Sequence, residues 1–135
     1  MTRPSLLLLA LAGCTTTSTY EDIASLCLTE GFGSEDEPAD VDMEAFEPFA
    51  LVQYSCTTLV DLTCDVEQVG DELVFRTVST FEEKTRFRCD MMLNWATAPC
   101  VLPEPVEAGA FTLVGGGSEM DVDLPGTVPQ RCLRP

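Results

Sequence analysis

The chain of 135 residues carries 23 acidic and only 7 basic side chains, for a formal net charge of −16, and it contains no histidine. The negative charge argues against nucleic acid or anionic lipid headgroups as partners, because both bind basic surfaces. The lack of imidazole excludes Ser-His and Cys-His catalytic pairs and any histidine acid or base.

The first 13 residues have the pattern of an export signal. A short positive start precedes an apolar run from Ser5 to Ala12, and this run is shorter than the roughly 20 residues that span a bilayer. The sequence Leu11-Ala12-Gly13-Cys14 then resembles the bacterial lipobox. That resemblance implies that Cys14 receives a diacylglycerol, that residues 1–13 are removed, and that the new amino terminus is acylated. The alternatives are an ordinary signal peptide with a chance cysteine, or a buried N-terminal strand.

We therefore expect lipid on Cys14 to hold the mature chain to a membrane. Each buried methylene contributes about 0.8 kcal/mol, so several acyl chains together form a firm anchor. The residue after the anchor is Thr15 and not Asp. By the sorting rule for lipoproteins of Gram-negative bacteria, this implies a place in the cell envelope at the outer membrane.

Residues 14–19 are predicted to form a polar, lipidated tether, and residues 20–135 a single disulfide-stapled domain. The segment Tyr20 to Glu30 is predicted as a short helix, because Thr19 is a suitable N-cap and Gly31 a suitable stop. The same residues also permit a strand.

The acidic segment 34–44 is predicted to be a solvated loop. It lacks the alternating ligand positions and the fixed glycine of an EF-hand loop, and Pro38 interrupts it. A calcium site there is the less favoured alternative.

From Phe49 onward the hydrophobic period is two, which is typical of strands with one buried face. Alternating runs cover Val60–Val66, Arg86–Met91 and Met120–Leu124, and a further strand is expected over Ala50–Cys56. In the first run Val60, Leu62, Cys64 and Val66 are predicted to face inward. Turns are predicted at Gly70-Asp71 and at Gly115-Gly116-Gly117-Ser118. The expected fold is all-β, a small immunoglobulin-like β-sandwich of six or seven strands.

Six cysteines follow Cys14, and an even number in an exported chain predicts three disulfides. Zinc is disfavoured, because the chain has neither a CxxC pair nor a histidine. The predicted pairs are Cys27 with Cys132, Cys56 with Cys64, and Cys89 with Cys100, since two join near neighbours and one ties the ends. A tight turn at Thr57-Thr58 would conflict with the second pair. Cys89, beside Arg88, is a weak candidate for a redox-active thiol.

A second resemblance covers about Leu51 to Leu133. Its motifs are Cys56, Cys64, Val69-Gly70-Asp71-Glu72-Leu73, Cys89, Cys100, Leu102-Pro103, Glu107-Ala108-Gly109-Ala110-Phe111-Thr112-Leu113 and Cys132. This order is similar to a group of small cysteine-rich lipoproteins of soil bacteria such as myxobacteria, in which a GD-L hairpin and an AG-Y-T strand recur among three disulfides. Phe111 stands where that group more often has Tyr. The resemblance implies a fold and a compartment, and it implies no activity.

No residue pattern indicates an enzyme, a cofactor or a metal site. Carboxylate pairs arise by chance among 23 acidic residues, and Trp95, the single tryptophan, is expected in the core or at its rim and not in a sugar cleft. Gly115 to Gly117 lack the Lys-Ser/Thr of a phosphate loop.

The expected function is a binding or adhesion module of the envelope, with a protein or glycan partner, because β-sandwiches display loops and edges as contact surfaces. A structural or accessory lipoprotein without a ligand of its own is the alternative. A calcium-dependent module or a small hydrolase is the third hypothesis.

Overall fold

The computed structural model describes residues 14–84, 89 and 92–135. The predicted export signal, residues 1–13, and the predicted strand Arg86–Met91 lie outside the described residues, except for Cys89. The described part of the chain consists of strands and one short 3₁₀ helix, η1 (Met43–Ala45), which confirms the all-β prediction. The strands are β1 (Thr15–Glu21), β2 (Ser25–Cys27), β3 (Ala39–Val41), β4 (Phe49–Tyr54), β5 (Thr58–Val69), β6 (Glu72–Lys84), β7 (Asn94–Val101), β8 (Gly109–Gly115), β9 (Ser118–Leu124), β10 (Gly126–Val128) and β11 (Cys132–Leu133).

The described residues thus form more strands than the six or seven expected. Besides β1 and β7, which the sequence analysis did not assign as strands, the difference comes from β2, β3, β10 and β11, which have only two or three residues each. Segments this short are too brief to show an alternating pattern, so the sequence did not predict them.

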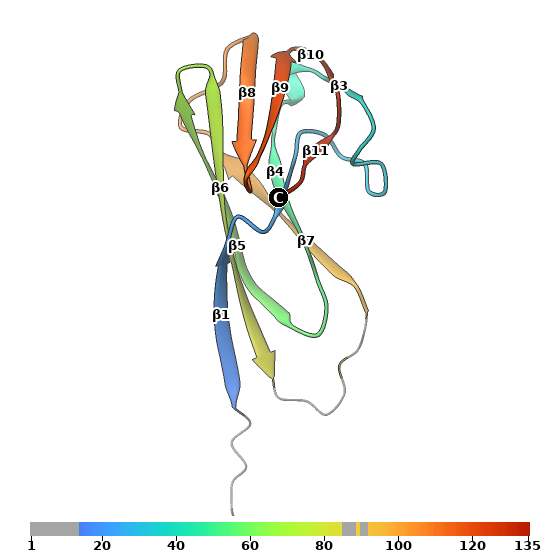
Figure 1. Ribbon diagram of the computed structural model, residues 1–135, viewed down its shortest axis with the longest axis vertical. Coiled ribbons are helices and arrows are strands. Elements are labelled where there is room, and N and C mark those ends of the chain that lie inside the picture. The colour runs from blue at the N-terminus through green and yellow to red at the C-terminus, as the bar shows by residue number, and fades with distance from the viewer. Residues whose placement is uncertain (1–13, 85–88, 90–91) are drawn as a thin grey trace, which may run out of the picture.

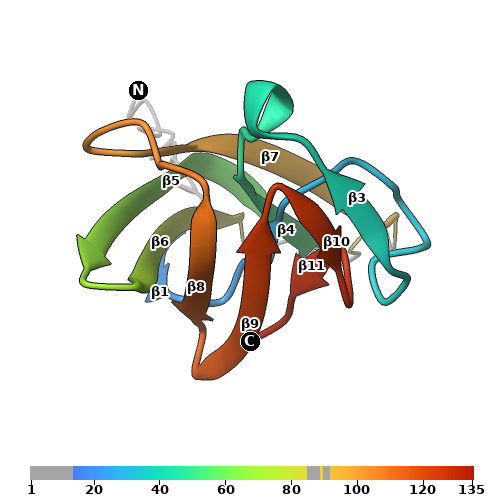
Figure 2. The same ribbon diagram turned by 90° about the horizontal axis from the view of Figure 1, so that it is seen from above.

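Nine of these strands form one sheet. Eight of them follow the order β11-β2-β4-β7-β5-β6-β8-β9, and the ninth, β1, pairs with the C-terminal half of β6, whereas β8 pairs with its N-terminal end. The pairs β5 with β7 and β6 with β8 are parallel, whereas the others are antiparallel. The long β5–β6 hairpin runs along the molecule (Figure 1). The sheet curls around the core, so that β9 comes back toward β11, which it contacts (Figure 2). Strands β3 and β10 form a separate two-stranded sheet.

The apolar core fills the inside of this curl. Leu73, Phe75 and Phe81 are buried along β6, and Met120, Val122 and Leu124 are buried along β9, as their alternation predicts. Each large apolar side chain that is fully buried contributes roughly 1.5–3 kcal/mol to stability. The inward rows of these strands therefore supply much of the driving force for folding.

Strand β5 departs from the predicted alternation near its start. Cys64 and Val66 are buried, but Val60, predicted to face inward, is 55% exposed. The register of β5 against β6 shifts between Leu59 and Asp61. Val60 is the extra residue at this bulge, so it drops out of the alternation and the side chains on its N-terminal side change face. The prediction for Val60 is wrong for this reason.

Both predicted glycine turns are present. Gly70 and Asp71 connect β5 to β6, and Gly116 and Gly117 connect β8 to β9. Gly116 and Gly117 have φ values of 57° and 80°, which is the left-handed conformation that a two-residue hairpin of type I′ needs at both positions. Glycine adopts it without steric cost.

The predicted helix over Tyr20–Glu30 is wrong, and so is the predicted tether over residues 14–19. Strand β1 instead pairs with β6 along its whole length, from Thr15 opposite Lys84 to Glu21 opposite Val78. Just after β1, the Asp22 N–H donates to the Thr77 carbonyl at 2.8 Å, and the Asp22 carboxylate accepts from the Thr77 N–H at 2.9 Å. These long-range partners outweigh the local helix signals, and the β-branched threonines of β1 favour an extended backbone.

The described cysteines other than Cys14 form three disulfides, Cys27 with Cys132, Cys56 with Cys89, and Cys64 with Cys100. The first is the pair expected to tie the ends of the chain. The expected pairs Cys56 with Cys64 and Cys89 with Cys100 are wrong. Strand β7 lies between β4 and β5, so these two strands do not form a hairpin across Thr57-Thr58. The insertion of β7 places Cys64 directly opposite Cys100, with their Cα atoms 4.5 Å apart.

Two hydroxyl groups on β6 are buried without a hydrogen-bond partner in the described part of the molecule, Thr77 Oγ1 and Ser79 Oγ. A buried hydroxyl that lacks a partner costs about 1–3 kcal/mol. The change Ser79→Ala removes this group and keeps the Cβ. We therefore expect it to raise the free energy of unfolding by about 1 kcal/mol in urea denaturation. A loss of stability of that size would contradict this account of the core.

Candidate binding cleft

Strands β4 and β7 carry a row of side chains on the face that points away from the main core. Along β4, Ala50 and Val52 belong to the main core, whereas Phe49 and Leu51 alternate with them and belong to a second, smaller apolar cluster. Side chains on one face of a strand recur every second residue. The ladder therefore places three cross-strand pairs on this outer face: Phe49 with Pro99, Leu51 with Thr97, and Gln53 with Trp95.

The disulfide between Cys27 and Cys132 lies in the same outer cluster. Cys27 on β2 is opposite Phe49 on β4 and opposite Cys132 on β11. Both cysteines are buried and pack with Leu51 and Phe49. The disulfide thus forms part of an apolar floor and ties the end of the chain to it.

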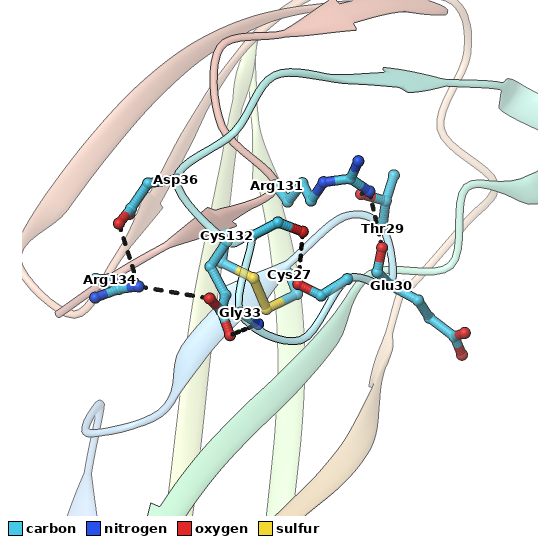
Figure 3. The surroundings of a disulfide bond; sticks show 11 residues. Cys27, Thr29, Glu30, Gly33, Asp36, Arg131, Cys132 and Arg134 are labelled. Atoms are coloured by element: carbon cyan, nitrogen blue, oxygen red, sulfur yellow. Dashed lines mark hydrogen bonds and ion pairs between the residues drawn. A yellow bond between two sulfur atoms is a disulfide. The ribbon is translucent and has the colours of Figure 1, made fainter.

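The segment after β2, residues 28–38, folds over this floor and is held by the last residues of the chain (Figure 3). The Leu28 N–H donates to the Arg131 carbonyl at 2.8 Å. The Glu35 carbonyl accepts from the N–H groups of Arg131 and Cys132, at 2.9 and 3.1 Å. We call residues 28–38 the covering loop.

Two arginine side chains add to this attachment (Figure 3). Arg131 Nη1 donates to the Glu30 carbonyl at 2.9 Å and to Thr29 Oγ1 at 3.4 Å. Arg134 forms ion pairs with Asp36 at 3.3 Å and with Glu35 at 3.7 Å. Arg134 and Asp36 are exposed whereas Glu35 is partly buried; an exposed ion pair adds at most about 1 kcal/mol, so the backbone hydrogen bonds carry most of the attachment.

A cleft of about 900 Å³ lies between the covering loop and the outer face, within the usual size range of ligand sites, about 300–1,000 Å³. Its lining includes Leu28 and Phe32 from the loop, Phe49 and Leu51 from β4, and Pro99 from β7. A second hollow of about 390 Å³ shares Phe32, Glu35 and Leu51 with the cleft and extends to Gln53 and Trp95. The two hollows share lining residues and follow one another along β4, and we call them together the outer cleft.

An exposed aromatic pair lines the smaller hollow. The rings of Phe32 and Trp95 are 5.3 Å apart at a tilt of 52°, although these side chains are 61% and 50% exposed. Large aromatic side chains contribute most when they are buried. Their exposure in a concave surface is therefore a mark of a contact site.

The charge around the outer cleft is negative. Glu30, Glu35 and Glu47 line the larger hollow, and no Lys or Arg is among its described lining residues. Arg134 lines the smaller hollow and is paired with Glu35 and Asp36. The pKa of the Glu35 carboxyl is below its usual value, because its own backbone N–H and that of Gly33 hydrogen-bond to it and Arg134 lies nearby. Glu35 is therefore a fixed negative charge at neutral pH.

The lowered pKa makes the covering loop sensitive to acid. A carboxylate whose pKa falls on folding contributes stability that is fully present above its ordinary pKa, and this stability is lost as the pH falls through the lowered value. We expect the contact between Gly33 N–H and Glu35 Oε1, 3.1 Å long, to weaken as the pH falls below about 4.5. The amide NMR shift of Gly33 should report this transition, and Glu35→Gln should abolish it. The same transition in the Glu35→Gln variant would contradict the assignment.

The structure places the residues singled out from the sequence as follows. Trp95 was expected in the core or at its rim, but it is half exposed, packs against neither apolar cluster and lines the outer cleft. Cys14 is exposed at the start of β1. The segment 34–44 is only partly a loop, because Ala39–Val41 is strand β3 and η1 begins at Met43. The sequence analysis did not predict a role for Phe32 or the covering loop. The alternation of apolar residues around Phe49 and Leu51 was the one sequence feature that could have indicated an apolar outer face.

In residues 14–84, 89 and 92–135 no three potential metal ligands gather into a group that could hold an ion. In the same residues no helix has the length and apolar character needed to cross a membrane.

Comparison with known proteins gave no match. No family model, no curated protein and no solved structure is significantly similar to this chain.

Proposed function

We propose that this protein is a lipid-anchored binding module of the bacterial cell envelope, and that it binds its partner through the outer cleft. The observation that carries the proposal is the outer cleft itself, a concave surface whose larger hollow is mainly apolar and which carries two exposed aromatic side chains, Phe32 and Trp95. Sites of this shape and composition are the usual location of ligand binding in proteins.

The anchor in this proposal rests on the lipobox-like sequence that ends at Cys14. The disulfides support an oxidising compartment outside the cytoplasm, where such bonds form and persist. Strand β1 begins at Thr15, directly after Cys14. Lipid on Cys14 would therefore hold the β1 end of the curled sheet at the membrane, which we propose is the outer membrane of a Gram-negative bacterium.

A pull-down from detergent-solubilised envelopes tests the binding function. The bait is the full chain, compared with Trp95→Ser and Phe32→Ser variants. We expect a partner to be retained by the wild type and lost from both variants, because each removes an aromatic side chain from the outer cleft. Val60→Ser is the matched control, since Val60 is also an exposed apolar residue but does not line the outer cleft.

Retention that is equal in all four proteins would overturn the outer cleft as the binding site. The absence of any retained partner would favour a structural or accessory lipoprotein without a ligand of its own.

A further inference from the structure

We propose that the occupant of the outer cleft is an extended, positively charged polypeptide segment of a partner protein, whose apolar side chains pack on the floor. This inference rests on the proposed function and adds the chemical class of the ligand.

The shape of the outer cleft fits an extended chain. The floor is built from residues of β4 that recur with a period of two, Phe49, Leu51 and Gln53, and from their partners on β7. In a strand, side chains on one face repeat at about 6.6–6.8 Å. An extended peptide has the same repeat, so every second side chain of the peptide can contact successive residue pairs along the floor.

The charge of the outer cleft selects a cation. Glu30, Glu35 and Glu47 line it, and residues 14–75 of the chain contain 15 acidic and no basic residues. The nearby arginines are engaged, Arg131 by the covering loop and Arg134 by Glu35 and Asp36. Opposite charge steers a partner to its site and suppresses partners of the same sign. A basic segment is therefore attracted and an acidic one is repelled.

The aromatic pair adds a second reason for a cation. A Lys or Arg side chain over an exposed aromatic face gains about 0.5–1 kcal/mol, and Phe32 and Trp95 offer such faces beside the Glu35 carboxylate. A glycan is less suited to this floor, because Phe49, Leu51, Pro99 and the disulfide offer it no hydrogen-bonding side-chain groups, and Thr97 and Gln53 are the polar side chains among the paired floor residues. Recognition of hydroxyl-rich ligands depends on such groups.

Trp95 is the single tryptophan of the chain and lines the outer cleft, so tryptophan fluorescence reports on this site alone. The full chain, in an uncharged detergent, is titrated with synthetic octapeptides that alternate leucine with lysine, serine or glutamate, and with a neutral oligosaccharide. We expect the leucine–lysine peptide to shift the Trp95 emission to shorter wavelength in a saturable way. Its affinity should exceed that of the other two peptides by about tenfold or more.

Matched charge variants separate the outer cleft from the general negative charge of the chain. Glu30→Gln with Glu47→Gln removes two carboxylates from the outer cleft and leaves Glu35 in place. The control, Asp65→Asn with Glu67→Gln, removes two exposed carboxylates from β5. We expect the first pair to weaken binding of the lysine peptide about tenfold and the control pair to change it less than about twofold.

Equal affinity for the lysine and serine peptides would overturn the proposed ligand class, and so would a response to the oligosaccharide alone or to no probe. Equal effects of the two variant pairs would also overturn it. None of these results tests the proposed function. That proposal fails separately if retention of a partner in the envelope pull-down does not depend on Trp95 and Phe32.

Discussion

Replacement of both Cys27 and Cys132 by alanine is expected to lower the free energy of unfolding by about 4–5 kcal/mol. The bond joins residues 105 apart in the sequence. Its removal restores the conformational freedom of most of the chain in the unfolded state. In the folded state it also removes two buried sulfur atoms from the cluster that includes Phe49 and Leu51. Urea denaturation of the variant and the wild type under the same conditions measures the difference.

The Cys64 and Cys100 pair provides the matched comparison. Its residues are 36 apart in sequence, so its removal should cost about 1 kcal/mol less in the same loop-entropy model. A larger loss for this shorter loop would show that local packing, and not chain entropy, sets the stabilisation. A loss below about 1 kcal/mol for Cys27 and Cys132 would contradict the role of that bond in closing the fold.

The change Leu73→Ala is expected to cost about 2–5 kcal/mol, the range for a large-to-small substitution in a close-packed core. Leu73 is 0% exposed. It lies on β6, which pairs with β5, β8 and β1, and its register partner on β8, Leu113, is also buried. At Leu73 the two neighbouring strands β5 and β8 hold the backbone in place, so the cavity has little room to collapse.

Chemical denaturation checks this prediction, with Val74→Ala as the control. Val74 is the next residue on the same strand, it faces the other way and it is only partly buried. We expect its replacement to cost less than half as much as Leu73→Ala. Equal losses for the two variants would mean that the core is not on the Leu73 side of β6.

The parts of the fold that depend on local pattern could be predicted from the sequence. Alternation placed Met120, Val122 and Leu124 in the core, and the paired glycines at 116 and 117 placed a hairpin. Alternation failed at Val60, where a bulge depends on how β5 meets β6. It also gave no information on β1, where pairing with the distant β6 overrides the helix signals near Tyr20.

The disulfides and the outer cleft depend on contacts between distant segments. Proximity in sequence suggested Cys56 with Cys64, but the crossover that places β7 beside β5 brings Cys100 to Cys64 instead. The covering loop is likewise held by Arg131, about 100 residues away from Glu30 in the chain. No local signal in residues 28–38 specifies that partner, so the sequence alone could not predict the outer cleft.

The central claim is that an exported, lipid-anchored and disulfide-closed domain presents the outer cleft from a membrane. Mass spectrometry of the native protein, with and without reduction, tests it most directly, because one measurement reads the amino terminus, the acyl groups and the disulfides. We predict a chain that begins at Cys14, carries acyl groups there, and gains the mass of six hydrogens when its three disulfides are reduced. A chain that keeps residues 1–13, lacks acyl groups and does not change mass on reduction would contradict the account.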